Sequence, residues 1–202
     1  MVETIDNAIQ LIVLIGCLAC AIVVSIRERD EGWYLLSGFY AAMAAGNFYW
    51  TLYLMLRADT PTYFYVSDIS WIAGFLFLDV CVNVLVGKER PDQNRWVPWI
   101  FPVFCAGMCV FFMQWGDWIV NAAMLAIFGH IGFSCLRGIM VKSPYAKFLI
   151  FPMVYMLLEC ALWTSSCFWT GDTLANPYYW IDTLISACYI VLLVAFRKTM
   201  RA

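Results

Sequence analysis

Residues 47–71, NFYWTLYLMLRADTPTYFYVSDISW, have a counterpart in residues 160–184, CALWTSSCFWTGDTLANPYYWIDTL. Three short motifs recur in the same order, the first two displaced by 113 positions and the third by 114: Trp50-Thr51 as Trp163-Thr164, Asp59-Thr60 as Asp172-Thr173, and Tyr65-x-x-Asp68 as Tyr179-x-x-Asp182. Tryptophan and aspartate are rare in apolar segments, so their ordered recurrence carries more weight than matching leucines. We interpret the two stretches as parts of an internal repeat.

The composition around these stretches is that of an integral membrane protein. Of the 202 residues, 64% are hydrophobic and only 13% are charged, against roughly a quarter charged in an ordinary soluble domain. The net charge of −2 gives no electrostatic reason to expect nucleic acid as a partner. The N-terminal segment carries Glu3 and Asp6 but no basic residue, so we expect the first apolar run to be a retained span rather than a signal peptide.

Seven apolar segments are long enough to cross a bilayer, which takes about 20 residues as a helix. The predicted spans are Ile5–Ile26, Trp33–Leu56, Tyr63–Val86, Trp96–Met113, Trp118–Ile139, Ala146–Trp169 and Tyr178–Phe196. The predicted fold is therefore all-α: one polytopic membrane domain over residues 1–202, with seven transmembrane helices and short loops.

The basic residues predict how these spans are oriented. Eleven of the twelve Lys and Arg fall in or beside the odd-numbered loops and the C-terminal tail, whereas Arg57 lies in an even-numbered loop. Positive residues stay on the cytoplasmic side, so the N-terminus is predicted outside and the C-terminus in the cytoplasm. The expected location is the plasma membrane of a bacterium.

The repeat fits this topology. Residues 5–86 form the first predicted triple-helix unit, residues 118–196 form the second, and residues 96–113 form a linker helix between them. Three spans per unit and one linker bring both units into the membrane from the same side, so they are parallel repeats about an axis along the membrane normal. Glu159 falls opposite Gly46 in this alignment, so the two units differ at one carboxylate.

This plan of three, one and three helices within 202 residues resembles that of the SWEET and PQ-loop transporters, and it is similar to that of the bacterial nicotinamide riboside transporters. The resemblance is one of architecture: the chain contains no Pro-Gln dipeptide, and its first two spans contain no proline. It implies a substrate site between the two triple-helix units, with paired side chains from the third and seventh spans. In this chain the implied pair is Asp68 and Asp182.

Ionisable residues within spans are costly and point to functional sites by default. Asp68 and Asp182 hold matching positions near the outer ends of their spans, and the alternative is that they only cap nearby backbone or hydroxyl groups. Asp79 follows Asp68 by 11 residues, about three helical turns, so both share a face that we expect to point to the bundle interior. Glu159 and His130, the only histidine, lie within spans six and five. With Asp79 they are the predicted proton-coupling residues, although His130 can equally be a hydrogen-bonding neighbour in packing.

The predicted ligand-binding residues are Asp68, Asp182, Trp50, Trp163, Asn47 and Trp71. No Lys or Arg lies deep enough in the spans to pair with the carboxylates, which then need a proton or a cation. Aromatic faces also attract cations, although any one of these tryptophans can equally serve in packing. The expected pocket is acidic and aromatic, opens to the outside, and suits a cationic or protonatable organic ligand.

The sequence contains no motif for catalysis or for a bound cofactor. The seventh span has no lysine for retinal before Lys198, and a single histidine excludes bis-histidine haem. The nine cysteines lie in apolar runs, where they are usually small reduced hydrophobes rather than metal ligands. We therefore predict a nonenzymatic protein without a cofactor or metal, with intramembrane hydrolysis by clustered carboxylates as the alternative.

The leading hypothesis is a small-solute transporter or facilitator. The rival hypothesis is a seven-span ligand sensor or an accessory subunit of a bacterial membrane complex, acting through a separate partner chain because only RKTMRA follows Phe196. The expected partners are the lipid bilayer and a small-molecule ligand. A second copy of the chain or another membrane protein is a further candidate partner, and nucleic acid is not.

Overall fold

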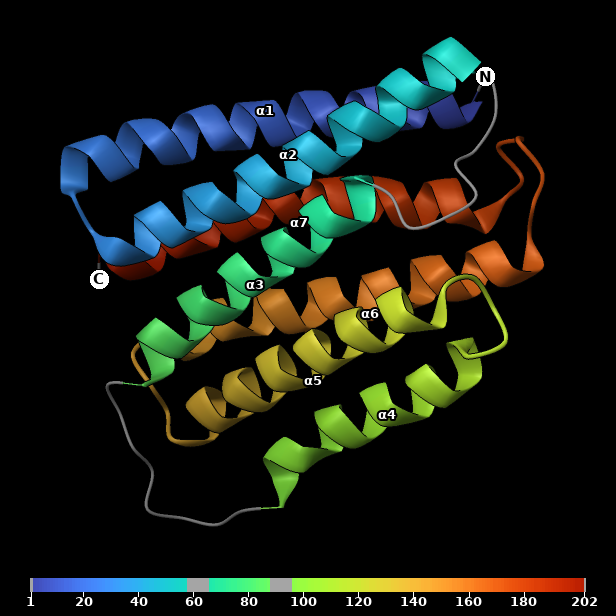
Figure 1. Ribbon diagram of the computed structural model, residues 1–202. Coiled ribbons are helices and arrows are strands. Elements are labelled where there is room, and N and C mark those ends of the chain that lie inside the picture. The colour runs from blue at the N-terminus through green and yellow to red at the C-terminus, as the bar shows by residue number, and fades with distance from the viewer. Residues whose placement is uncertain (1, 58–65, 88–95, 202) are drawn as a thin grey trace.

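The computed structural model describes residues 2–57, 66–87 and 96–201, and over these residues the chain is all-α (Figure 1). Seven α-helices follow one another in the described ranges, and a short 3-10 helix, η1 (Val97–Trp99), leads into the fourth. They are α1 (Val2–Glu28), α2 (Glu31–Arg57), α3 (Val66–Val86), α4 (Ile100–Phe112), α5 (Trp118–Met140), α6 (Ala146–Phe168) and α7 (Pro177–Met200). Of the repeated motifs, Asp59, Thr60 and Tyr65 lie outside the described residues.

Five of the described helices are long and apolar enough to cross a membrane, namely α1, α3, α5, α6 and α7. The helix α2 has 27 residues, but Trp, Tyr and Gly residues and Asn47 interrupt its aliphatic sequence and lower its hydropathy. The helix α4 has 13 residues, which at 1.5 Å per residue cover about 20 Å of a hydrocarbon layer about 30 Å thick. The seven predicted helices are present, and two of them fall short of the hydropathy or length of an independent span.

Side-chain caps determine where two of the helices begin. The Asn176 side chain accepts a hydrogen bond of 3.0 Å from the backbone N–H of Tyr178, and Pro177 occupies the first turn of α7. The Asp117 carboxylate accepts bonds of 2.8 and 3.1 Å from the backbone N–H groups of Ile119 and Val120, at the start of α5. These caps satisfy amide donors that have no partner within the helix.

Six helices form a closed ring. Going round it, α1 packs on α2, α2 on α3, α3 on α5, α5 on α6, α6 on α7, and α7 on α1 again. The fourth helix lies outside this ring against α5, at the edge of the bundle (Figure 1). Glycines allow this close packing, because a Cβ at Gly129 would lie 3.3 Å from the Pro102 backbone and one at Gly132 would overlap the Phe101 ring. The start of α1 and the end of α7 lie at opposite ends of the bundle (Figure 1).

Aromatic side chains fill the middle of the ring. Phe39 and Tyr40 from α2, Phe75 from α3, Tyr155 from α6 and Tyr189 from α7 are each at most 1% exposed. Their rings contact one another across the bundle, with centroid distances of 5.7 Å between Phe75 and Tyr155 and 5.3 Å between Tyr155 and Tyr189. We call these five residues the aromatic core. They close the bundle beneath the cavity described next.

Candidate functional site

A cavity of about 650 Å³ lies at the end of the bundle where α1 and α7 begin and α6 ends. The exposed loop residues Gly116 and Thr170 lie at its mouth, and the buried Phe75 and Tyr189 of the aromatic core lie at its floor. The volume is in the range that holds a small organic molecule. This is the end of the bundle predicted to face outside.

Six of the nine residues singled out in the sequence line this cavity: Asn47, Trp50, Trp71, Glu159, Trp163 and Asp182. They come from four helices, α2, α3, α6 and α7, which the ring brings together at one end. Asp68, Asp79 and His130 are not among the residues that line it. Asp68 lies half-buried in the first turn of α3, and its expected pairing with Asp182 across the cavity stays a prediction.

A chain of buried polar side chains runs across the cavity wall. Gln10 of α1 donates a hydrogen bond of 2.7 Å to Asp182 Oδ1 and accepts one from the side-chain amide of Asn47. The indole Nε1 of Trp71 donates to Asn47 Oδ1 at 3.3 Å. Gln10, Asn47 and Asp182 are each at most 6% exposed. The network therefore connects α7, α1, α2 and α3 and fixes the orientation of the carboxylate.

The start of α1 contributes two more carboxyl groups than the sequence analysis assigned to the site. The helix begins at Val2, so Glu3, which lay before the predicted span, joins Asp6 on its first two turns. Glu3 lines the cavity, and the carboxyl group of Asp6 interacts with that of Asp182. Sequence reasoning also missed Gln10. A usable signal was present, because polar residues at positions 3, 6, 7 and 10 recur at helical spacing at the start of an apolar helix.

Glu159 lies deeper than Asp182. It is nine residues before the end of α6, or about 14 Å along the helix, and it is 7% exposed. The Tyr155 hydroxyl interacts with the Glu159 carboxylate and lies 2.9 Å from the hydroxyl of Tyr189. Tyr40 donates a 2.7 Å hydrogen bond to the backbone carbonyl of Tyr189. The carboxylate thus connects the cavity to the hydroxyl groups of the aromatic core.

Tryptophans form two opposite parts of the cavity wall. Trp50 and Trp71, from α2 and α3, contact each other with ring centroids 5.7 Å apart. On the other side, Trp163 of α6 stacks on Phe128 of α5 at 5.4 Å and 20°. All three tryptophans are half-buried, so part of each indole remains available to a ligand. These three residues give the cavity an aromatic lining.

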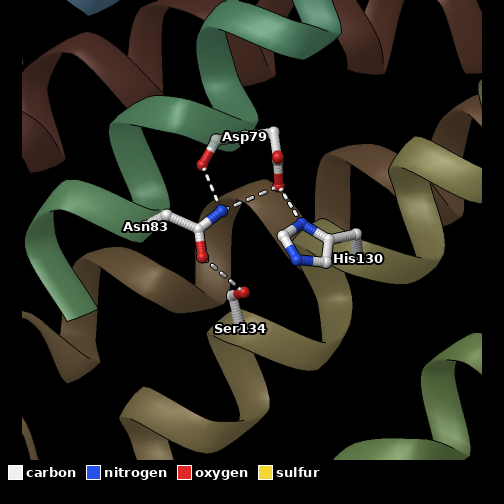
Figure 2. A network of polar contacts seen from close by, with 4 residues as sticks. All are labelled: Asp79, Asn83, His130 and Ser134. Atoms are coloured by element: carbon white, nitrogen blue, oxygen red, sulfur yellow. Dashed lines mark hydrogen bonds and ion pairs between the residues drawn. The ribbon is translucent and has the colours of Figure 1, made fainter. Parts of the chain in front are cut away.

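Asp79 and His130 form a second polar network away from the cavity (Figure 2). His130 Nδ1 lies 2.7 Å from Asp79 Oδ1, and Asn83 donates bonds of 2.8 and 3.1 Å to the Asp79 backbone carbonyl and to Oδ1. Ser134 donates a 2.9 Å bond to Asn83 Oδ1. The face of α3 that carries Asp79 was expected to point to the bundle interior. Phe75 on this face lies in the aromatic core, whereas Asp79, one turn further along, contacts His130 of α5.

The described lining of the cavity is acidic and contains no basic side chain to balance it. Among the described residues that line it are Glu3, Glu159 and Asp182, and none of the lining residues is Lys, Arg or His. Carboxylates removed from water need hydrogen bonds, a proton or a cation. The amide of Gln10 and the hydroxyl of Tyr155 supply hydrogen bonds to two of them but no positive charge.

Comparison of the chain with known protein families, with curated proteins and with solved structures finds no match. None of these comparisons supports the resemblance to SWEET and PQ-loop transporters.

Proposed function

We propose that this protein is a small-solute transporter or facilitator of the cell membrane, and that its cavity binds an organic cation or a protonatable amine. The observation that carries the proposal is the pairing of two buried carboxylates, Glu159 and Asp182, with a wall of tryptophans in a cavity without Lys, Arg or His in its described lining.

The charge of the cavity favours a cation over a neutral or anionic solute. Asp182 is 4% exposed, and the groups in contact with it are the amide of Gln10 and the carboxyl of Asp6. Two carboxyl groups in contact need a shared proton or a cation between them. An ammonium group would satisfy both, and its apolar body would pack on the indole faces of Trp50 and Trp163, which attract cations.

A proton and the ligand would compete for the same carboxylates. Glu159, at the floor, contacts the hydroxyl network of Tyr155 and Tyr189, which offers a proton a route between the cavity and the aromatic core. We propose that Glu159 carries a proton when the ligand is absent. Asp79 and His130, which were also predicted to couple to a proton, are not among the residues that line the cavity.

The ring of helices supports the proposed repeat. In parallel repeats α1, α2 and α3 correspond to α5, α6 and α7, so the contact between α3 and α5 corresponds to the contact between α7 and α1. Both contacts are present, the middle helices α2 and α6 each pack on both neighbours of their own unit, and α4 lies outside the ring. The cavity is then lined by both units, as alternating access of a site between two units requires.

Binding is tested first, with benzyltrimethylammonium and its uncharged carbon analogue neopentylbenzene on the purified protein in detergent micelles. The cation should bind more tightly than the analogue, and Asp182→Asn should weaken cation binding about tenfold to a hundredfold, the range for one charged hydrogen bond. Glu31→Gln, at the opposite end of the bundle, is the matched control and should bind as the unchanged protein does. Equal binding of the two probes would refute the cation site.

Transport is tested separately, in proteoliposomes that contain no probe at the start of the assay. Uptake of labelled benzyltrimethylammonium should saturate and should fall in Asp182→Asn and Glu159→Gln but not in Glu31→Gln. Binding without uptake would keep the site but favour the ligand sensor.

A further inference from the structure

A second concave site lies on the other side of the bundle, between α4 and α5. This groove has a volume of about 560 Å³ and is lined by small or apolar side chains together with one imidazole. The lining residues are Trp99, Pro102, Cys105, Ala106, Cys109, Ala122, Leu125, Ala126, Gly129, His130 and Phe133. None of them lines the acidic cavity, so the groove is independent of the proposed function.

His130 lies near the middle of α5, a helix that is long and apolar enough to cross a membrane. It is 12 residues after the start of α5 and 10 before its end, which places it about 15 to 18 Å from either end of the helix. Its side chain is nevertheless 58% exposed. A polar ring facing hydrocarbon at this depth is costly unless another group satisfies it.

The network behind His130 determines which ring nitrogen is available (Figure 2). Asn83 donates to Asp79 Oδ1, so this oxygen acts as an acceptor, and the ring nitrogen 2.7 Å from it, Nδ1, carries the proton. Ser134 in turn donates to Asn83 and fixes the direction of the amide. In a neutral imidazole with its proton on Nδ1, Nε2 is a bare acceptor. Within the described part of the chain, no group hydrogen-bonds to Nε2.

From this geometry we propose that the groove between α4 and α5 binds a membrane-dissolved molecule with an apolar body and a hydroxyl group, which donates a hydrogen bond to His130 Nε2. Water-soluble ligands do not reach this depth from the lipid side, whereas an alcohol or phenol dissolved in the bilayer does. The groove's volume matches sites for small molecules. Its one acceptor complements one donor, and its remaining surface complements a hydrocarbon body.

Asp79 and Asn83 hold the exposed His130 ring in place. The carboxylate holds the ring in one orientation and one tautomer, as second-shell carboxylates do for histidines that bind ligands. Both partners come from α3, so the rigid contact between α3 and α5 positions the acceptor. Small residues such as Ala106 and Ala126 leave room in front of it.

The test compares two brominated probes that differ only in the donor, 3-bromo-5-octylphenol and its methyl ether, added to the protein in lipid nanodiscs. Bromine quenches nearby indole fluorescence, and Trp99 lines the groove. The difference in quenching between the unchanged protein and Trp99→Phe measures binding in the groove. The phenol should bind about fivefold to tenfold more tightly than the ether, as expected for one buried hydrogen bond.

Two variants separate the hydrogen bond from the groove. His130→Ala should lower phenol affinity to that of the ether and leave the ether unchanged, whereas Ala126→Leu should fill the groove and weaken both probes. Asp182→Asn, in the acidic cavity, is the control and should change neither. Equal binding of phenol and ether, or a phenol preference that survives His130→Ala, would overturn the proposal. So would loss of a bound partner chain in Ala126→Leu, since the groove would then hold a protein helix.

Discussion

Gly46→Ala should displace the Trp71 indole, which forms part of the wall of the acidic cavity. An added Cβ would lie 2.6 Å from Trp71 Nε1, 2.7 Å from its Cδ1, and 3.3 Å from the backbone oxygen of Ser67. Non-bonded carbon atoms pack at about 3.5 to 4.0 Å, so the indole has to move. Trp71 Nε1 also donates to Asn47, and its displacement breaks that hydrogen bond. Gly16→Ala in α1 is the matched control, because its Cβ would meet nothing within 4 Å.

The two substitutions share one effect and differ in another. Both replace a helical glycine by alanine, which stabilises a helix by about 1 kcal/mol. Gly46→Ala also overpacks the contact between α2 and α3, at about 1 to 3 kcal/mol, and removes a hydrogen bond of about 1 kcal/mol. The propensity gain cancels in the comparison, so Gly46→Ala should be about 3 kcal/mol less stable than Gly16→Ala. For a chain of this size that is a difference of about 6 to 12 °C in Tm.

The assay is thermal unfolding of both variants in the same detergent, followed by binding of benzyltrimethylammonium. Gly46→Ala should unfold at the lower temperature and bind the cation more weakly, because Trp71 no longer forms the wall with Trp50. If the two variants have the same Tm and the same affinity, Trp71 does not occupy the space in front of Gly46 and the geometry of this wall is wrong.

Two further predictions concern the same cavity. Gln10→Leu removes the amide that donates to Asp182 and accepts from Asn47, so it should destabilise the protein by about 1 to 3 kcal/mol; unfolding in detergent measures this, and an unchanged Tm would contradict a buried network. Trp163→Leu keeps an apolar side chain but removes an aromatic face, so cation affinity should fall about fivefold while affinity for neopentylbenzene changes less. A parallel loss for both probes would mean that Trp163 acts by packing alone.

The sequence predicts most of the residues that line the cavity, because the rare residues in its two related stretches lie near the same end of the bundle. Trp50 lies seven residues before the end of α2, Trp163 lies five residues before the end of α6, and Asp182 lies in the second turn of α7. Length, hydropathy and alternating direction are enough to place such residues at one end of a bundle. The membership of the cavity wall was therefore predictable for these three.

The sequence does not determine how far each helix is rotated about its own axis, and therefore which neighbour a given side chain contacts. Successive i+4 steps along α3 turn by about 40° each, so a row that begins at Trp71 and Phe75 in the cavity has turned toward α5 when it reaches Asp79. Only the packing of α3 between α2 and α5 determines where along this row the cavity ends. The same packing gives Asp79 its partner His130, which lies 51 positions away in the sequence.

Under the proposed repeat, the two contacts between the units contain different polar groups. The contact between α1 and α7 contains Gln10 and Asp182, which lie at the cavity. The contact between α3 and α5 contains Asp79 and His130, and His130 faces the groove on the side of the bundle.

Equivalent positions of α2 and α6 also carry different residues. At position 46 of α2 a glycine admits the Trp71 indole, and at the equivalent position of α6 the chain has Glu159. A ligand in the cavity therefore meets an aromatic face from the first unit and a carboxylate from the second at the same depth. Its charged group should point toward Glu159 and Asp182, and its apolar body should pack between Trp50 and Trp163.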